Sequence, residues 1–178
     1  MKKNTSVSLS DFVDKIYTLK ALTRYNNKFK IISESVAEHS YFVAVLTLKL
    51  HDDYTFNLEK ALKMALIHDI PELHLSDVTH DVKRNFPQLA NEVTKAEYVI
   101  MRDKYPSWYD AFKKFEDQDS VEALIVKMAD NLSCVQYATA EMELGNKGYM
   151  KEVAQNATKR VIQCENNLKK WRKKNAKK

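Results

Sequence analysis

The scarcity of turn-forming residues is the feature that most limits how this chain can fold. It has only two glycines and three prolines among 178 residues. A β-sandwich or an α/β sheet needs many more such residues at its turns, so their scarcity favours helices joined by short polar links. A chain of this length can form one domain with a sizeable core. We therefore predict an all-α fold, a compact single-domain helical bundle.

Apolar periodicity and capping residues locate the helices. Ser35 and Glu38 form a capping box, in which the serine hydroxyl accepts from the Glu38 amide while the Glu38 carboxylate reaches back. Asn57 is the expected cap of the next helix, and Pro71 disfavours helical geometry at the residue before it, so a break is expected there. We expect helices over residues 9–22, 35–50, 58–69, 88–104, 107–115, 120–144 and 149–173.

The formal net charge of +5 is concentrated at the C-terminus. The last ten residues, KKWRKKNAKK, hold seven Lys or Arg and no acid, which leaves residues 1–168 with a net charge of −2. We therefore divide the chain into a domain at residues 1–168 and a basic tail at residues 169–178. We interpret the tail as the solvated end of the last helix. The alternative is a tail that attracts phosphate or another polyanion.

The cysteines and the N-terminus predict a cytoplasmic protein. Cys134 and Cys164 are far apart and neither belongs to a CxxC-type motif, so a reducing compartment is expected. The first residues, MKKNTSVSLSDF, lack the long apolar stretch of a signal peptide. No segment approaches about 18 consecutive apolar residues, so we expect no membrane span and no membrane partner.

A His-Asp dipeptide occurs three times, and its surroundings separate the copies. His51-Asp52 lies at an expected helix end, where a cationic histidine complements the helix dipole. His80-Asp81 lies in the polar run SDVTHDVKR, which we expect to be a loop. His68-Asp69 instead follows the apolar run MALI, which carries the imidazole into the interior, where it needs a partner.

Two further candidate ligands have similar apolar surroundings. Asp130 follows IVKMA on a long predicted helix, and His39 lies one turn into the helix that the capping box begins. Each of these residues alone could be a core polar group with satisfied hydrogen bonds. Together, His39, His68, Asp69 and Asp130 form a suitable cage for one divalent transition metal: Mn²⁺, Co²⁺, Fe²⁺, Ni²⁺ or Zn²⁺. Such a metal can activate water at neutral pH, so these residues predict a metal-dependent hydrolase.

The order H…HD…D in an all-helical chain resembles that of the HD-domain metal phosphohydrolases. Three blocks, RYNNKFKIISESVAEHS, IHDIPELHLSDVTHDVK and VKMADNLSCVQYATAEMELGN, are similar to the YfbR-like 5′-deoxynucleotidase branch. The resemblance implies an HD-type helical bundle that is often dimeric, so we expect a homo-oligomer. It also implies His39, His68, Asp69 and Asp130 as metal ligands, Glu72 and Asp77 as catalytic carboxylates, and Arg24 as a phosphate contact.

Two positions depart from the family pattern. The family commonly has Trp after the arginine, where it packs against the sugar and helps to exclude a 2′-hydroxyl; this chain has Tyr25. Tyr25 keeps the aromatic face and adds a hydroxyl that can bond a ribose, which leaves the choice between deoxyribose and ribose open. His80 stands where the family often has a Thr-Pro pair. With Lys83 and Lys127, it is a candidate for further phosphate contacts.

We expect a small-molecule nucleotide substrate, attacked at its α-phosphorus so that a nucleoside is released. A deoxynucleoside monophosphate is favoured, and hydrolysis of a deoxynucleoside triphosphate to triphosphate, as in similar short phage-type proteins, is the alternative. A (p)ppGpp hydrolase fits less well, because such enzymes usually show HDxxED where this chain reads HDIPEL. A non-catalytic module that binds nucleic acid through the tail is opposed by the acidic body and by a tail whose only aromatic residue is Trp171. We therefore expect no specific nucleic-acid partner.

Overall fold

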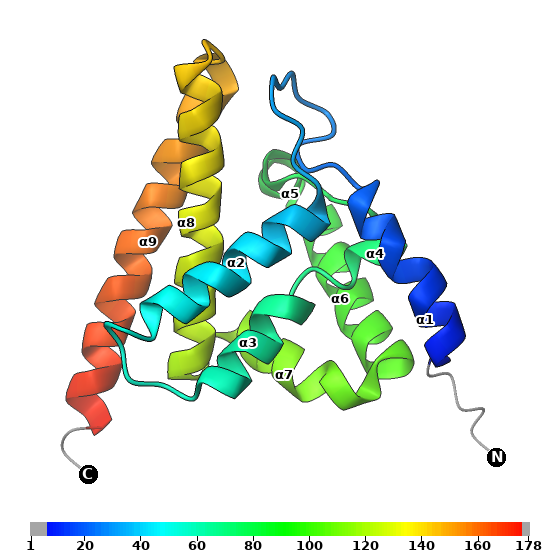
Figure 1. The fold of residues 1–178 in the computed structure, drawn as a ribbon, viewed down its shortest axis with the longest axis vertical. Coiled ribbons are helices and arrows are strands. Elements are labelled where there is room, and N and C mark those ends of the chain that lie inside the picture. Colours follow the sequence, from blue (N-terminus) through cyan, green and yellow to red (C-terminus); the bar gives the residue numbers. More distant parts are fainter. Residues whose placement is uncertain (1–6, 176–178) are drawn as a thin grey trace.

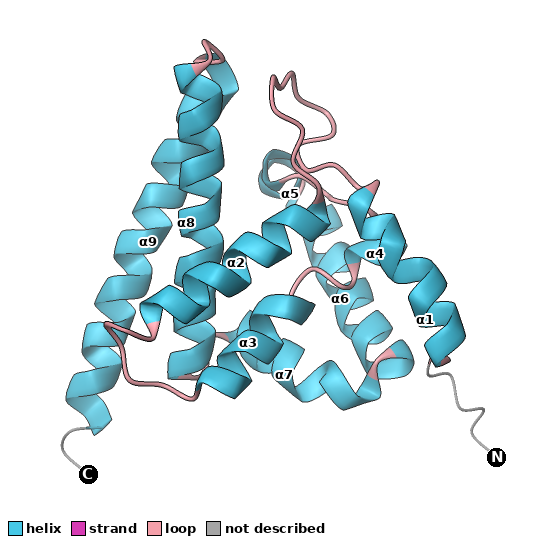
Figure 2. Cartoon of the chain, in the orientation of Figure 1, coloured by secondary structure: helices cyan, strands magenta, loops and turns pink. Residues whose placement is uncertain are grey.

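The computed structural model describes residues 7–175 of the chain. Within them the only β-structure is an isolated antiparallel bridge between Thr23 and Ser35, and the all-α prediction is confirmed (Figure 2). The helices are α1 (Leu9–Ile16), the 3₁₀ helix η1 (Tyr17–Lys20), α2 (Val36–Leu50), α3 (Leu58–Ile67), α4 (Glu72–Leu75), α5 (His80–Asn85), α6 (Pro87–Lys104), α7 (Pro106–Asp117), α8 (Val121–Glu143) and α9 (Gly148–Asn175).

The two longest helices, α8 and α9, lie side by side and antiparallel along one flank of the molecule (Figure 1). A short turn joins them at Gly145, whose φ of 104° lies in the left-handed region that favours glycine. Helix α2 packs on both α8 and α3, while α6 and α1 lie on the opposite flank. The candidate site lies where α2, the end of α3 and α8 come together.

Two groups of buried apolar side chains fix the end of α3. The larger group joins α2, α3, α8 and α9, and α3 contributes Ala65 to it. The second group joins η1, α3, α6 and α7, and α3 contributes Ile67 to it. Burial of an isoleucine-sized side chain contributes roughly 1.5–3 kcal/mol. His68, which follows immediately, is therefore held between two packed cores.

Side-chain caps begin three of the helices that surround the site. Ser35, Asn57 and Ser120 each accept a backbone N–H at the start of α2, α3 and α8. The capping box forms as expected: Glu38 N donates to Ser35 Oγ at 3.2 Å and Ser35 N donates to Glu38 Oε2 at 2.7 Å. The break before Pro71 is also present, since α3 ends at Ile67.

Short helices were not predicted. The predicted loop at His80-Asp81 is wrong, because His80 begins α5. Helix α4 was not expected either. Both are too short to show apolar periodicity. The predicted helix over residues 9–22 is shorter in the structure, since α1 ends at Ile16 and a 3₁₀ turn follows.

Two sequence predictions fall partly beyond the described residues. The expected absence of a signal peptide concerns the first twelve residues, of which residues 1–6 lie outside the described part. Helix α9 continues into the predicted tail as far as Asn175, and residues 176–178 also lie outside the described part. The division at residue 168 stays a prediction. Across residues 7–175, none of the helices combines the length and the apolar character that crossing a membrane requires.

Candidate active site

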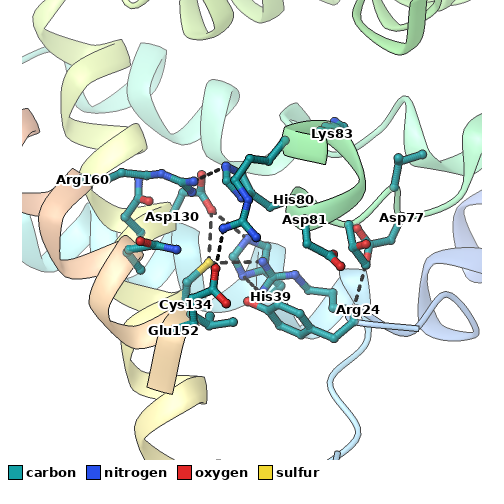
Figure 3. A pocket seen from close by; sticks show the side chains of 18 of the residues that line it. Arg24, His39, Asp77, His80, Asp81, Lys83, Asp130, Cys134, Glu152 and Arg160 are labelled. Atoms are coloured by element: carbon teal, nitrogen blue, oxygen red, sulfur yellow. Dashed lines mark hydrogen bonds and ion pairs between the residues drawn. The ribbon is translucent and has the colours of Figure 1, made fainter. Parts of the chain in front are cut away.

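A cavity of about 220 Å³ lies between α5, α8, α9 and the segment that precedes α2 (Figure 3). The predicted catalytic residues, three of the four predicted metal ligands and the predicted substrate contacts other than Lys127 line it. These residues are Arg24, Tyr25, His39, Asp69, Glu72, Asp77, His80, Lys83 and Asp130. The fourth predicted ligand, His68, lies behind them.

His39 is placed by the first turn of α2, and its side chain is almost completely buried. Its Nε2 atom lies 3.2 Å from Asp130 Oδ1 and 3.8 Å from Asp69 Oδ2. The other ring nitrogen, Nδ1, lies 3.2 Å from Ser133 Oγ and 2.9 Å from Arg24 Nη1. A metal bound at Nε2 would require the tautomer in which Nδ1 carries the proton and donates it to the Ser133 hydroxyl, whereas the Arg24 contact requires Nδ1 to accept.

His68 directly follows α3, at the end of the helix before Pro71. Its Nδ1 atom lies 2.8 Å from the carbonyl oxygen of Ala65, so Nδ1 carries the proton and donates it. The Nε2 atom is buried without a hydrogen-bond partner and lies 3.2 Å from Asp69 Oδ2. Burial alone would lower the pKa of His68, but the facing Asp69 carboxylate raises it, and a bound cation would take the place of that proton between the two groups.

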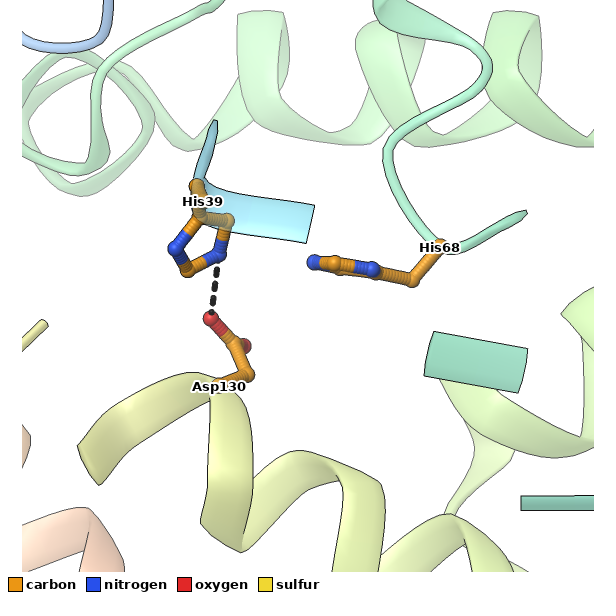
Figure 4. A group of neighbouring side chains, drawn as sticks. All are labelled: His39, His68 and Asp130. Carbon is orange, nitrogen blue, oxygen red and sulfur yellow. Dashed lines mark ion pairs between the residues drawn. The ribbon is translucent and has the colours of Figure 1, made fainter. Parts of the chain in front are cut away.

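Ligand atoms of His39, His68 and Asp130 lie within 4.8 Å of one another (Figure 4). They come from α2, the end of α3 and α8, as the apolar surroundings of these residues in the sequence predicted. Asp69 adds a second carboxylate beside the two imidazoles. Two imidazoles and two carboxylates suit a divalent transition metal better than Mg²⁺ or Ca²⁺. The donor set and the unpartnered nitrogen of His68 both fit a metal ion.

The charges around this cluster prepare it for a cation. Burial alone would raise the pKa of Asp130, but the nearby Lys127 and His39 hold it well below its usual value. Burial is likewise outweighed at Asp69, whose pKa is lowered by His68 and His39. Burial lowers the pKa of His39, which favours the neutral imidazole that metals bind. The carboxylates are therefore ionised at neutral pH.

Arg24 is held beside the cluster by the segment before α2. Its backbone N–H donates to the Glu34 carbonyl at 2.9 Å, and Nη1 donates to Glu34 Oε2 at 2.7 Å. Nη2 donates to the Cys134 thiol at 3.3 Å. The side chain is only 15% exposed, so it is not a solvated arginine at a helix end. Since Nη1 lies next to His39, a phosphate at the metal cluster is also within reach of the guanidinium.

Tyr25 forms part of the cavity wall and is buried. Its ring stacks on Tyr137, with ring centroids 5.3 Å apart and an interplanar angle of 4°. The nearby Cys134 thiol influences the pKa of its hydroxyl. Burial raises the pKa of this hydroxyl, so it stays protonated. Its backbone φ of 53° is unusual for a residue other than glycine.

The two predicted catalytic carboxyls also line the cavity. Glu72 begins α4, and its Oε2 atom is buried without a hydrogen-bond partner. Burial raises the pKa of Glu72 well above its usual value, and Asp69 and Asp77 add to the effect. Burial also raises the pKa of Asp77, although Arg24 opposes it. These shifts move both carboxyls toward the range in which they can exchange protons with a reacting group.

The basic residues on the α5 side of the cavity already have protein partners. His80 is contacted by the Arg160 guanidinium, and burial and Arg160 lower its pKa, so it is neutral. Lys83 donates to Glu97 at 3.2 Å. Arg84 next to it is paired with Glu152 of α9. The charges of Lys83 and Arg84 on the α5 side of the cavity are therefore already neutralised by protein carboxylates.

Sequence reasoning missed Cys134 and Arg160 as cavity residues. Cys134 lies four residues after Asp130 on α8, and this helical spacing was the available signal. Arg160 had no local signal, because the packing of α9 on α8 brings it there. Lys127, predicted as a phosphate contact, is not among the residues that line the cavity. It binds Asp130 Oδ2 at 3.0 Å instead.

Comparison with known proteins shows the family to which the chain belongs. The family model described as 5′-deoxynucleotidase YfbR-like matches residues 11–171. The chain belongs to the YfbR-like family. The 5′-deoxynucleotidase hdd1 of Schizosaccharomyces pombe is 35% identical to this YfbR-like protein over 145 residues, 76% of this chain and 73% of that protein. The human 5′-deoxynucleotidase HDDC2 is 25% identical over 149 residues, 79% of this chain and 71% of that protein.

The fold agrees with this assignment. The PH0347 protein of Pyrococcus horikoshii OT3 superposes with a TM-score of 0.76 at 29% identity, covering 91% of this chain and 94% of that chain. The matches to the bovine and mouse forms of HDDC2 span 57% and 59% of those proteins. The predicted resemblance is confirmed: this YfbR-like protein is an enzyme of the class of metal-dependent phosphoric ester hydrolases.

Proposed function

We propose that this protein is a divalent-metal-dependent 5′-deoxynucleotidase that cleaves deoxynucleoside 5′-monophosphates into deoxynucleoside and phosphate. The observation that carries the proposal is that one cavity is lined by Arg24, by three of the proposed metal ligands, and by Glu72 and Asp77. A phosphate contact, a cation site and two proton-exchanging groups are the parts that hydrolysis of a phosphate ester requires. The names of the curated relatives support the same activity.

His39, His68, Asp69 and Asp130 would hold the metal. When bound, the metal supplies a Lewis acid for a phosphate oxygen and for water. The cyanophage S-2L HD phosphohydrolase DatZ shares the fold at a TM-score of 0.58 and 16% identity, and its structure holds dA and one catalytic Zn²⁺ ion. We propose one ion per site here too. Co²⁺, Mn²⁺, Zn²⁺, Ni²⁺ and Fe²⁺ all suit the donor set.

The remaining residues bind the substrate and move protons. The Arg24 guanidinium can form two parallel hydrogen bonds to phosphate oxygens. The Tyr25 ring offers an aromatic wall to the sugar. One of the two carboxyls, Glu72 or Asp77, takes a proton from the attacking water as the water oxygen bonds to phosphorus. The other gives a proton to the 5′-oxygen as the ester bond breaks.

The paired cations of α5 favour a monophosphate over a triphosphate. Lys83 and Arg84 are neutralised by Glu97 and Glu152, so further phosphates would have to displace protein carboxylates to use them. Phosphate release from dAMP by metal-depleted protein on titration with Co²⁺ tests the function. We expect release to rise and level off at about one ion per chain. Absence of release with the ion bound would contradict the proposal.

We also propose a cytoplasmic, homo-oligomeric enzyme that acts on a small nucleotide and needs no nucleic-acid partner. Cys134 and Cys164 are both free thiols, which suits a reducing compartment. Exposed apolar side chains on one helix, at Tyr41, Phe42 and Leu48 of α2, suit contact with a second copy. Light scattering in solution tests the oligomeric state, and a monomer at high concentration would contradict it.

A further inference from the structure

One lysine beside the metal-ligand cluster has no place in the mechanism described so far. Lys127 lies one turn before Asp130 on α8, and its Nζ atom lies 3.0 Å from Asp130 Oδ2. The other oxygen of the same carboxylate, Oδ1, faces His39 Nε2 at 3.2 Å. The two carboxylate oxygens thus have separate partners, one a protein cation and the other a metal-ligand imidazole.

Lys127 is not among the residues that line the cavity. Its ammonium group lies over the Phe115 ring, 4.8 Å from the centroid. The same ring makes an edge contact with His68, at a centroid distance of 5.4 Å. Phe115 therefore fixes Lys127 and His68 relative to each other, and it is itself only 2% exposed.

We propose that Lys127 is a positioning residue of the metal centre: it holds Oδ2 of Asp130, so that Asp130 presents only Oδ1 to a divalent ion bound with His39 and His68. This inference rests on the proposed metal-dependent function. Partners behind the ligands commonly set the orientation of metal-binding groups, and their removal costs about 10–100-fold in metal affinity. A free carboxylate on this short side chain could instead rotate and offer both oxygens.

Glu116 is a further acid near Lys127. Burial raises the pKa of Glu116, while Lys127 lowers it. The lysine thus lies between a half-buried glutamate on α7 and the ligand on α8. Asp130 is the metal ligand with which Lys127 makes an ion pair, so a change in Asp130 geometry is the signature that distinguishes positioning from general packing.

The test uses three variants of the full chain and Co²⁺ as the probe ion. Lys127→Met removes the charge and keeps the apolar stem, and Lys127→Arg keeps a donor. Lys49→Met is the matched control, because Lys49, near the end of α2, pairs with Asp52 at the same three-residue spacing and both side chains are mostly exposed to solvent. The measurements are the Co²⁺ dissociation constant, by competition with a chelating dye, and the visible absorption spectrum of bound Co²⁺.

We expect Lys127→Met to bind Co²⁺ about 10–100-fold more weakly and to show weaker visible bands, because a second Asp130 oxygen raises the coordination number. Lys127→Arg should keep the wild-type spectrum, and Lys49→Met should match wild type in both measurements. Unchanged or tighter Co²⁺ binding by Lys127→Met with a wild-type spectrum would overturn the inference. If Lys127→Met does not fold, Lys127→Gln replaces it with the same expectations. If wild type and Lys49→Met bind no Co²⁺, the proposed metal centre itself is wrong and the inference falls with it.

Discussion

Asp77 Oδ2 accepts a hydrogen bond from the backbone N–H of Tyr25 at 2.9 Å, across 52 positions of sequence. The bond joins a predicted catalytic carboxyl to the segment that carries the predicted phosphate contact, Arg24. It also supports Tyr25 in a left-handed backbone conformation that costs a non-glycine residue of order 1–3 kcal/mol. Asp77 is thus part of the scaffold of the site as well as a candidate for its chemistry.

The two roles of Asp77 can be separated by substitution. Asp77→Asn keeps an oxygen that can accept from Tyr25 N–H, so we expect the free energy of unfolding to change by less than about 1 kcal/mol. The lost carboxyl should still lower kcat by about 10²–10⁴-fold, with metal content unchanged. Asp77→Ala should lose kcat and also unfold more easily in urea. Equal stability of the two variants would contradict the scaffold role.

Removing His68 should remove the metal. We expect His68→Ala to fall from about one bound ion per chain to nearly none, because the site loses one of its two imidazoles, and to lose nucleotide hydrolysis. His51→Ala is the control, since His51 belongs to another His-Asp dipeptide and contacts Phe56, away from the cavity. Metal content is measured by elemental analysis after gel filtration. Equal metal content in the two variants would show that the ion binds elsewhere.

Tyr25 should preserve selectivity for deoxyribose, despite its hydroxyl. The side chain is buried and its ring stacks on Tyr137, so the hydroxyl has little freedom to turn toward a ribose 2′-hydroxyl. We expect Tyr25→Phe to change the ratio of kcat/KM for dAMP over AMP by less than about tenfold, or about 1.4 kcal/mol. A larger change would show that the Tyr25 hydroxyl discriminates between the sugars.

The buried carboxylate of Glu141 gives stability a defined pH dependence. It is fully buried and accepts hydrogen bonds from Ile31 N, Ile32 N and Asn146 Nδ2. Burial alone would raise its pKa, but these hydrogen bonds lower it below the usual value of 4.5. Because the folded pKa is the lower one, the stabilisation is complete above pH 4.5 and is lost as the pH falls below it.

Glu141→Gln should therefore lower the free energy of unfolding by about 1–3 kcal/mol at pH 7. The difference from wild type should shrink as the pH falls below the usual glutamate pKa of 4.5. Urea unfolding at several pH values measures it. Glu92→Gln is the control, because Glu92 is exposed and pairs only with Lys95. A difference for Glu141→Gln that stays constant with pH would contradict the assigned role.

Local signals explain what could be predicted from the sequence. The caps at Ser35, Asn57 and Ser120 act within one turn, so the starts of α2, α3 and α8 were predictable. His39 and Asp130 were identified because a polar group in apolar surroundings needs a partner. Their proximity to His68 then follows from the packing of α2, α3 and α8.

Contacts that depend on tertiary packing were not predictable. Arg160 reaches the cavity because α9 packs on α8, and Glu34 holds Arg24 through a bridge between two loop segments. The short helix α5 was mistaken for a loop because six residues carry too little periodicity. The lysine at position 127 was assigned to phosphate because its charge is visible in the sequence, whereas its direction toward Asp130 is not.

Product analysis across substrates tests the central claim most directly. Purified protein loaded with Co²⁺ would be incubated with dAMP, AMP and dATP, and the products separated by chromatography. The site predicts deoxyadenosine and phosphate from dAMP, much less adenosine from AMP, and no triphosphate from dATP. Deoxyadenosine with intact triphosphate from dATP, or no product from dAMP although Co²⁺ is bound, would contradict a metal-dependent 5′-deoxynucleotidase.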